Sequence, residues 1–278
     1  MRRDLPWVGR CVLFPPSRGR DLRLSNTRLI PLIIERDVRI LFSDAFLVAI
    51  MFANFAIDLF VTAATFGRLV TGQGANYFLF IAPGSNLITA MVAAFQSGRD
   101  VWREKYIKDL TSYLLTLPVQ RPVLAFSRVL GGVVRSVIAT FPGTLVICYL
   151  YGILFTPKIF VAYLIVGLFS LGIVGLSMAI SAFSSSIEMW VTVRSAIQLY
   201  LSFLSALFYP VSVFPSFLAP IVSSNPMTWA IQAFRQLSPI AFAQVPAGDS
   251  LRSIATLAGP SLAFALLGTI CYIWYSKL

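Results

Sequence analysis

The stretch RDVWREKYIKDLTSYLLTL, residues 99–117, is the densest run of charge between two long apolar segments of the chain. Residues 77–98 before it carry no charge, and neither do residues 136–157 after it. About 20 such residues cross a bilayer as a helix. The charged stretch is therefore predicted to be a helix outside the membrane, held between two membrane spans.

The same stretch has the pattern of an amphipathic helix that ends at Pro118. Apolar side chains recur at three- and four-residue steps from Trp102 to Leu117, and charged residues take most other positions. Two interpretations stay open from this pattern. It could be a linker lying on the lipid headgroups, or a docking helix for a soluble protein, because aromatic residues and Arg are enriched where proteins meet.

Composition places the whole chain in a membrane. Of its 278 residues, 58% are hydrophobic and 12% are charged, whereas a soluble domain is about 25% charged. We therefore expect an all-α integral membrane protein with an Arg-rich tail at 1–28 and a single membrane domain at 29–278. The net charge of +11 does not indicate a nucleic-acid partner, because the basic residues cluster beside the apolar runs, as they do on the cytoplasmic side of membrane proteins.

Catalytic and metal chemistry have little support in the sequence. The chain has no His, and Cys11, Cys148 and Cys271 do not have metal-ligand spacing. An intramembrane enzyme acting on lipids is the rival class, but Asp58 has no second acid well inside a span. We expect no catalytic residues, no metal and no cofactor in this chain.

Six membrane spans are predicted from the apolar runs. An interfacial helix at 29–42 precedes them, and repeated prolines at 215–240 predict short helices that fold part-way back into the outer leaflet. Only Arg68, Lys158, Arg235 and Arg252 are assigned to the outer side, so both termini and the 99–117 helix are predicted to be cytoplasmic. The predicted spans are 44–66, 77–98, 123–155, 159–183, 195–213 and 253–275.

Polar residues inside the spans are candidates for a substrate path. Asp58 is either a functional carboxylate at depth or a residue near the outer interface. Mostly apolar spans with a few polar groups suit an amphipathic cargo. The candidates are Asn54, Asp58 and Asn86 in the first two spans and Gln198, Ser202 and Tyr209 in the fifth.

Three phrases, in order and at fitting distances, carry a family resemblance. They are Phe80–Gly84 (FIAPG), Tyr113–Arg121 (YLLTLPVQR), and a set of prolines and polar residues near the end of the chain. With them the chain resembles the membrane (permease) subunit of type-2 ATP-binding-cassette exporters over residues 29–275, nearer the drug and lipid branch. Many members carry a Gly early in the charged helix, where this chain has Lys108-Asp109-Leu110. The residues that match the family motifs are Pro83, Gly84, Pro118, Tyr209-Pro210, Pro215, Asn225, Pro226 and Arg235.

The resemblance implies two ATPase subunits and a second permease subunit, identical or a paralogue, in the plasma (inner) membrane. ATP and Mg²⁺ would sit on the ATPase subunits, in agreement with the absence of a Lys after Gly as a phosphate-binding loop requires. The 99–117 helix would couple the ATPase to export of a drug, lipid or lipid-linked molecule, with a polysaccharide or glycolipid exporter as the alternative. A passive channel would not need such a helix. The expected docking residues are Trp102, Arg103, Glu104, Ile107, Asp109 and Tyr113.

Overall fold

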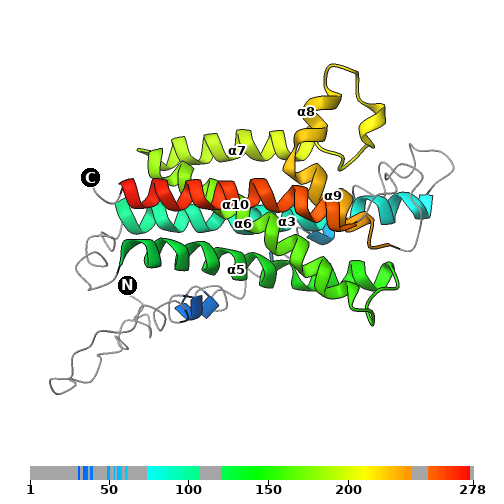
Figure 1. Cartoon of the computed structure of the whole chain (residues 1–278), viewed down its shortest axis with the longest axis horizontal. Helices are drawn as coiled ribbons and strands as arrows, with labels where there is room; N and C mark the ends of the chain where they lie inside the picture. The colour runs from blue at the N-terminus through cyan, green and yellow to red at the C-terminus, as the bar shows by residue number, and fades with distance from the viewer. Residues whose placement is uncertain are drawn as a thin grey trace, which may run out of the picture.

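The computed structural model describes residues 74–106, 120–238 and 250–275, together with scattered helical positions between 31 and 61. Within these residues every regular element is a helix, as predicted for an all-α fold. Figure 1 shows long helices side by side, with short ones at one end. The elements are α3 (Gly74–Tyr106), α5 (Arg121–Leu150), α6 (Lys158–Phe183), α7 (Ile187–Phe203), the 3-10 turn η1 (Val211–Val213), α8 (Ala219–Ser224), α9 (Pro226–Arg235) and α10 (Ser250–Tyr275).

Four of the described helices are long and apolar enough to cross a membrane: Tyr77–Glu104, Arg121–Leu150, Lys158–Phe183 and Arg252–Trp274. They correspond to four of the six predicted spans. The predicted span 44–66 and interfacial helix 29–42 fall largely outside the described residues, and the tail 1–28 falls wholly outside them.

Successive long helices run in opposite directions (Figure 1). One end of the bundle therefore collects the end of α3 and the beginning of α5, with Arg99, Arg103 and Arg121. We call this the basic end. The opposite end collects η1, α8 and α9, with Pro210, Pro215, Pro220 and Pro226.

Helix α3 continues past the predicted end of its span. It includes Pro83 without a break and extends to Tyr106. The helix therefore passes the predicted boundary at residue 98, and the first part of the predicted 99–117 helix continues α3 into the basic end.

Helix α7 shows that the predicted bounds of the fifth span, 195–213, are wrong at both ends. The helix begins at Ile187, where Ser186 Oγ accepts a hydrogen bond from the Met189 amide at 3.1 Å and Glu188 lies in the first turn. Both features stabilise a helix N-terminus. It ends at Phe203, and of its residues only Trp190, Leu201 and Ser202 are buried. Helix α7 thus lies along an edge of the bundle (Figure 1).

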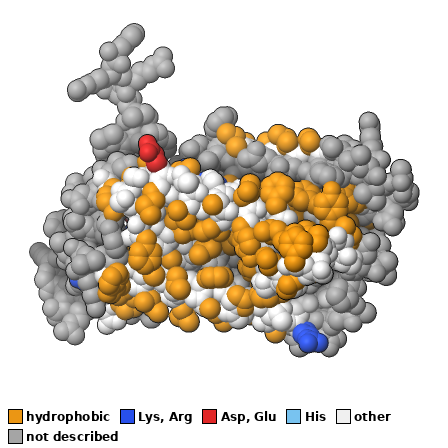
Figure 2. All heavy atoms as spheres, turned by 90° about the horizontal axis from the view of Figure 1, so that it is seen from above, with side chains coloured by type: hydrophobic (Ala, Val, Ile, Leu, Met, Phe, Trp, Pro, Cys, Tyr) orange, Lys and Arg blue, Asp and Glu red, His pale blue; other side chains and the backbone are white. Residues whose placement is uncertain are grey.

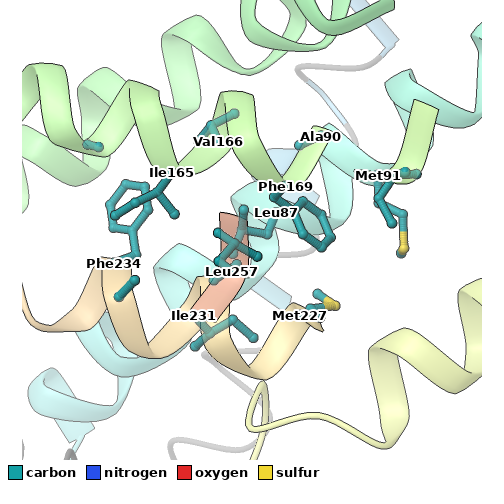
Figure 3. Packing of buried hydrophobic residues seen from close by; sticks show 14 of the residues in the cluster. Leu87, Ala90, Met91, Ile165, Val166, Phe169, Met227, Ile231, Phe234 and Leu257 are labelled. Carbon is teal, nitrogen blue, oxygen red and sulfur yellow. The ribbon is translucent and has the colours of Figure 1, made fainter. Parts of the chain in front are cut away.

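Short helices do occur in the predicted region 215–240. Helix α8 is mostly exposed, whereas seven residues of α9 are buried. Figure 3 shows Met227, Ile231 and Phe234 of α9 pointing into the core. There they meet side chains of α3, α6 and α10, including Leu87, Ala90, Met91, Ile165, Val166, Phe169 and Leu257.

The outer helices face their surroundings with apolar side chains. Figure 2 shows one face of the molecule covered mainly by hydrophobic residues. In the span of α3, 78% of the residues are buried, against 22% in that of α10, so α3 is central and α10 peripheral.

Small residues bring α6 and α10 together at backbone distance. A Cβ added to Gly175 would lie 2.3 Å from the Phe264 carbonyl oxygen, and one at Gly268 would lie 2.1 Å from the Gly175 carbonyl oxygen. A Cβ at Gly167 would meet nothing within 4 Å. Along α6, Gly175 therefore approaches a neighbouring helix at backbone distance, whereas Gly167 does not.

Candidate functional site

Trp102, a predicted docking residue, lies inside the permease. Its side chain is 7% exposed, and its Nε1 donates a hydrogen bond to the Ser184 carbonyl oxygen at 3.2 Å. Ser184 follows the end of α6 and precedes α7. Trp102 therefore ties the end of α3 to the turn between α6 and α7, and its assignment to an ATPase contact stays a prediction.

Glu104 is likewise held by its own chain. It accepts hydrogen bonds from Arg128 of α5 and, at 3.2 Å, from Arg36 near the N-terminus. One turn earlier, Asp100 pairs with Arg135 of α5 at 2.5 Å. With 12% of its side chain exposed, Glu104 clamps α3 to α5, and its assignment to an ATPase contact stays a prediction.

The remaining docking candidates divide into one exposed residue and three that the structure does not describe. Arg103 is exposed at the basic end. Ile107, Asp109 and Tyr113 lie outside the described residues, as does Pro118. The assignment of these residues to an ATPase contact stays a prediction.

The four substrate-path candidates that the structure describes lie on α3, on α7 and in the chain after α7. Asn86 has no exposed surface, and its Nδ2 donates to Thr144 Oγ1 of α5 at 2.9 Å. It belongs to the contact between α3 and α5, and its assignment to a substrate path stays a prediction. Gln198 is half-buried and accepts from Arg194 Nη2 at 3.3 Å, Ser202 is buried and Tyr209 is exposed. Asn54 and Asp58 lie outside the described residues.

Pro83 leaves a backbone carbonyl without its helical donor, and Tyr151 satisfies it. Proline has no N–H, so the Leu79 carbonyl four residues earlier loses its usual partner. Tyr151 Oη donates to this oxygen at 3.0 Å. Tyr151 follows the end of α5 and is buried, so the proline in α3 is also a point of attachment to α5.

Arg235 binds the same part of α3 from the other side. Its Nε and Nη2 donate to the Phe80 carbonyl at 3.0 and 2.8 Å. Nη1 donates to the Ala206 carbonyl at 2.9 Å and Nη2 to the Leu207 carbonyl at 3.1 Å. The guanidinium carbon lies 3.4 Å from the centre of the Phe80 ring, a cation–π contact. A fully buried cation is thus bound by backbone dipoles, and it joins α9, α3 and the chain beyond α7.

Asn225 completes this arrangement, which we call the arginine node (Phe80, Pro83, Ala206, Leu207, Asn225 and Arg235). Its Oδ1 accepts from the Met227 amide at 2.9 Å and caps α9, while Pro226 takes the first helical position. Its Nδ2 donates to the carbonyls of Leu201 and Leu204 at 3.3 and 2.6 Å, which lie at the end of α7.

Two further motif residues lie beside the node. Pro210 precedes the 3-10 turn η1. A Cβ at Gly84 would lie 1.8 Å from a methyl carbon of Leu207, so Gly84 allows the chain beyond α7 to approach α3. Pro83, Gly84, Asn225, Pro226 and Arg235 therefore gather at this node, and their separate phrases in the sequence did not reveal this meeting.

An apolar cavity of about 380 Å³ adjoins the node between α6, α7, α9 and α10. Ile173 and Leu176 of α6 line one side, and Ile197 and Tyr200 of α7 line the other. Trp229 of α9 also contributes. Its lining suits an apolar group with a polar end.

The described residues contain no cluster of three or more acidic, Cys or His side chains that could hold a metal ion. What they offer is a mechanical arrangement: a central helix clamped by ion pairs at the basic end and by the arginine node at the opposite end. The sequence analysis did not identify Tyr151 as the donor to the Leu79 carbonyl or Arg128 as the partner of Glu104. A proline inside a span was the available signal for the first contact. An acid near the end of one span, with two arginines seven residues apart at the start of the next, was the available signal for the second.

Comparison with known proteins identifies the family of this chain. A search of the curated proteins finds no match. The family model described as "ABC-2 type transporter" matches residues 28–238, which is most of the chain and includes the basic end and the arginine node. The chain therefore belongs to the ABC-2 type transporter family, as a membrane subunit of an ABC transporter.

Proposed function

We propose that this chain is the permease of an ATP-driven exporter of hydrophobic or amphipathic molecules, such as drugs, lipids or lipid-linked compounds. It would work as a dimer with two ATPase subunits, in the plasma membrane, with the basic end and both termini in the cytoplasm. The family implies an ATPase partner, while the cargo class, direction and stoichiometry are our proposal.

One observation carries the mechanical part of the proposal. Helix α3 is continuous from the arginine node to Tyr106, immediately before the segment expected to contact the ATPase. Near that end Glu104 and Asp100 bind α5, and Trp102 binds the turn between α6 and α7. A displacement of the segment after Tyr106 would therefore move three neighbouring elements together.

The apolar surface of α7 supports the cargo class. Val191, Leu199 and Phe203 are exposed large apolar residues on a helix with few buried positions, and the cavity beside α7 is lined mainly by apolar side chains. A sugar polymer would require many hydrogen-bonding groups, whereas an acyl chain or apolar drug requires a dry surface. These residues favour the hydrophobic cargo over the polysaccharide alternative.

Docking is tested by co-purification of the ATPase subunit in mild detergent. Arg103→Glu reverses an exposed charge at the basic end, and Arg252→Glu makes the same change at an exposed position of α10 at the opposite end. We expect Arg103→Glu to lose the ATPase and Arg252→Glu to retain it. Equal retention by both variants would show that the ATPase does not bind at the basic end.

Transport is tested in proteoliposomes holding the complete complex, with a fluorescent phospholipid analogue as cargo. Leu176→Trp fills the apolar cavity, whereas Leu164→Trp adds the same group at an exposed position of the same helix. We expect ATP-dependent transfer to fall only with Leu176→Trp. Normal transfer by this variant would remove the cavity from the path, and transfer of glycans but not of the phospholipid would favour the alternative cargo.

A further inference from the structure

The apolar cavity between α6, α7, α9 and α10 has a buried inner part and an exposed margin. Phe169, Ile173 and Leu201 line the inner part, and each is at most 4% exposed. Tyr200 of α7 and Ser224 of α8 also belong to the lining and are exposed. The cavity therefore opens beside Tyr200 and Ser224, and a molecule that enters there reaches side chains that surface lipid does not contact.

The helices that border this opening face hydrocarbon. Figure 1 shows α7 running alongside α10, and both helices line the cavity. Leu199 and Phe203 of α7 and Leu262 and Leu266 of α10 are exposed large apolar residues. Exposed apolar residues on helices within a bilayer contact lipid tails, which are as apolar as Leu. The nearest molecules to the opening are therefore the hydrocarbon chains of bilayer lipids.

Neither a void nor water is a favourable filling for this space. An empty cavity is unfavourable in proportion to its volume, and this one measures about 380 Å³. A buried water molecule needs about two to four polar partners, whereas the lining of the inner part is apolar except for Ser261 of α10. A cavity of about 150 Å³ with Leu, Ile and Phe walls stays dry and binds benzene. An apolar occupant larger than benzene is therefore expected here.

The cavity is elongated, with polar groups toward one end. Its lining on α6 runs from Phe169 to Leu176, which is about two turns, or about 10 Å. Trp229 of α9 belongs to the lining together with Ser224, toward the opposite end of the bundle. No described residue accepts a hydrogen bond from Trp229 Nε1, and this atom is not among the polar atoms that the protein encloses without a partner. An indole N–H away from water usually finds a partner, so Trp229 offers a donor to a carbonyl near the opening.

We propose that the cavity binds a hydrocarbon chain of a membrane lipid, with the ester group at Trp229 and the chain end between Ile173 and Leu176. The ester carbonyl accepts from the indole N–H, and the chain fills the space beside Phe169 and Leu201. This inference rests on the proposed function in treating the cavity as part of a hydrophobic path, but binding itself requires neither ATP nor export. The lipid is either cargo or a resident lipid of the permease, and the experiment separates the two.

The experiment uses the purified permease–ATPase complex in phosphatidylcholine nanodiscs without ATP. Two phosphatidylcholine probes carry a photoreactive diazirine, one at the chain end and one next to the ester. After irradiation, peptide mass spectrometry locates the labelled residues. We expect the chain-end probe to label Ile173 and the ester-side probe to label Trp229. Labelling confined to exposed positions such as Leu262 and Leu266, or the reverse pattern of the two probes, overturns the proposal.

Ile197→Trp and Leu199→Trp form a matched pair on α7. Ile197 lines the cavity, whereas Leu199 is 63% exposed and lies outside the lining. Because the larger ring occupies the cavity, Ile197→Trp should abolish labelling of Ile173 by the chain-end probe, and Leu199→Trp should leave it at the wild-type level. Leu176→Trp fills the same space from α6 and replaces Ile197→Trp if that variant does not assemble. Equal labelling of Ile173 in the filled and control variants would mean that the probe does not reach it through the cavity, which overturns the proposal.

Adding ATP separates cargo from resident lipid, and it separates this inference from the proposed function. Loss of Ile173 labelling during ATP hydrolysis assigns the chain to cargo, and retained labelling assigns it to a resident lipid. Labelling of Ile173 without phospholipid transfer in proteoliposomes would contradict the proposed function alone. Phospholipid transfer without labelling of Ile173 would contradict this inference alone.

Discussion

Replacing Arg235 by Met should loosen the whole opposite end of the bundle. Met has a similar length and stays apolar, so it fills the volume but donates no hydrogen bond. The Ala206 and Leu207 carbonyls lie beyond the end of α7 at Phe203, and both accept from Arg235. The substitution leaves these two buried oxygens without the guanidinium donor. It also removes both N–H donors, Nε and Nη2, that Arg235 supplies to the Phe80 carbonyl near Pro83.

The expected magnitude follows from those carbonyls. An unsatisfied buried acceptor costs about 1–3 kcal/mol, so two cost about 2–6 kcal/mol. Removing the buried guanidinium recovers part of this cost, because a desolvated charge is itself unfavourable. A net loss of about 3 kcal/mol corresponds to a fall in Tm of about 6–12 °C for a chain of this size.

The assay is thermal unfolding in detergent, followed by tryptophan fluorescence, which includes Trp229 on α9. Arg252→Met is the matched control, since Arg252 is exposed at the opposite end and its loss should change Tm by about 2 °C or less. Arg235→Lys should fall between the two, because one ammonium group cannot reproduce the planar fork. A Tm for Arg235→Met equal to that of Arg252→Met would refute the role given to the arginine node.

Three further outcomes follow from the same contacts. Glu104→Arg should lower the free energy of unfolding by about 3 kcal/mol, because it places a positive charge beside Arg128. The double variant with Arg128→Glu should recover much of this loss. Denaturant unfolding measures both variants, and no recovery in the double variant would contradict a direct Glu104–Arg128 pair. Gly175→Ala should cost about 1–3 kcal/mol, because α10 backbone occupies the space of the new methyl group, while Gly167→Ala should be neutral by the same measurement. Trp102→Phe should lower the free energy of unfolding by about 1 kcal/mol, because it removes the hydrogen bond to the turn after α6. It should also lower the number of molecules transported per ATP hydrolysed. An unchanged ratio would show that Trp102 contributes only to packing.

The helices that the sequence predicts best are those with uncharged interiors. The fourth span was predicted at 159–183, and α6 is Lys158–Phe183. The sixth was predicted at 253–275, and α10 is Ser250–Tyr275. Length and apolarity alone determine such segments, because a bilayer requires both.

The fifth span was misplaced because the prediction began it immediately after Arg194, the last charged residue before a long uncharged run. In the structure α7 contains both Glu188, in its first turn, and Arg194, near its middle. Charges at a helix end can extend toward the aqueous interface, so they do not exclude a membrane helix. Ser186 followed by Glu188 was the available signal for the start of α7.

The role of Arg235 could not be predicted from its neighbours in the chain. It was assigned to the outer side as a basic residue, but it donates to the Phe80 carbonyl 155 residues earlier. Its acceptors are backbone oxygens, which every residue carries, so the sequence around them gives no sign of a cation partner. Only the folded arrangement identifies which carbonyls lack a helical donor.

The two ends of α3 are held by different kinds of interaction, and this difference matters for movement. At the basic end the contacts join side chains, and Glu104 accepts from two arginines at once; such pairs can exchange partners as the helices shift. At the arginine node a guanidinium binds the backbone of Phe80, Ala206 and Leu207, and these oxygens move only with their segments. Helix α3 therefore has a fixed end near Pro83 and an adjustable end near Glu104. A force applied after Tyr106 would tilt the helix about the node, and the end with exchangeable ion pairs would move farthest.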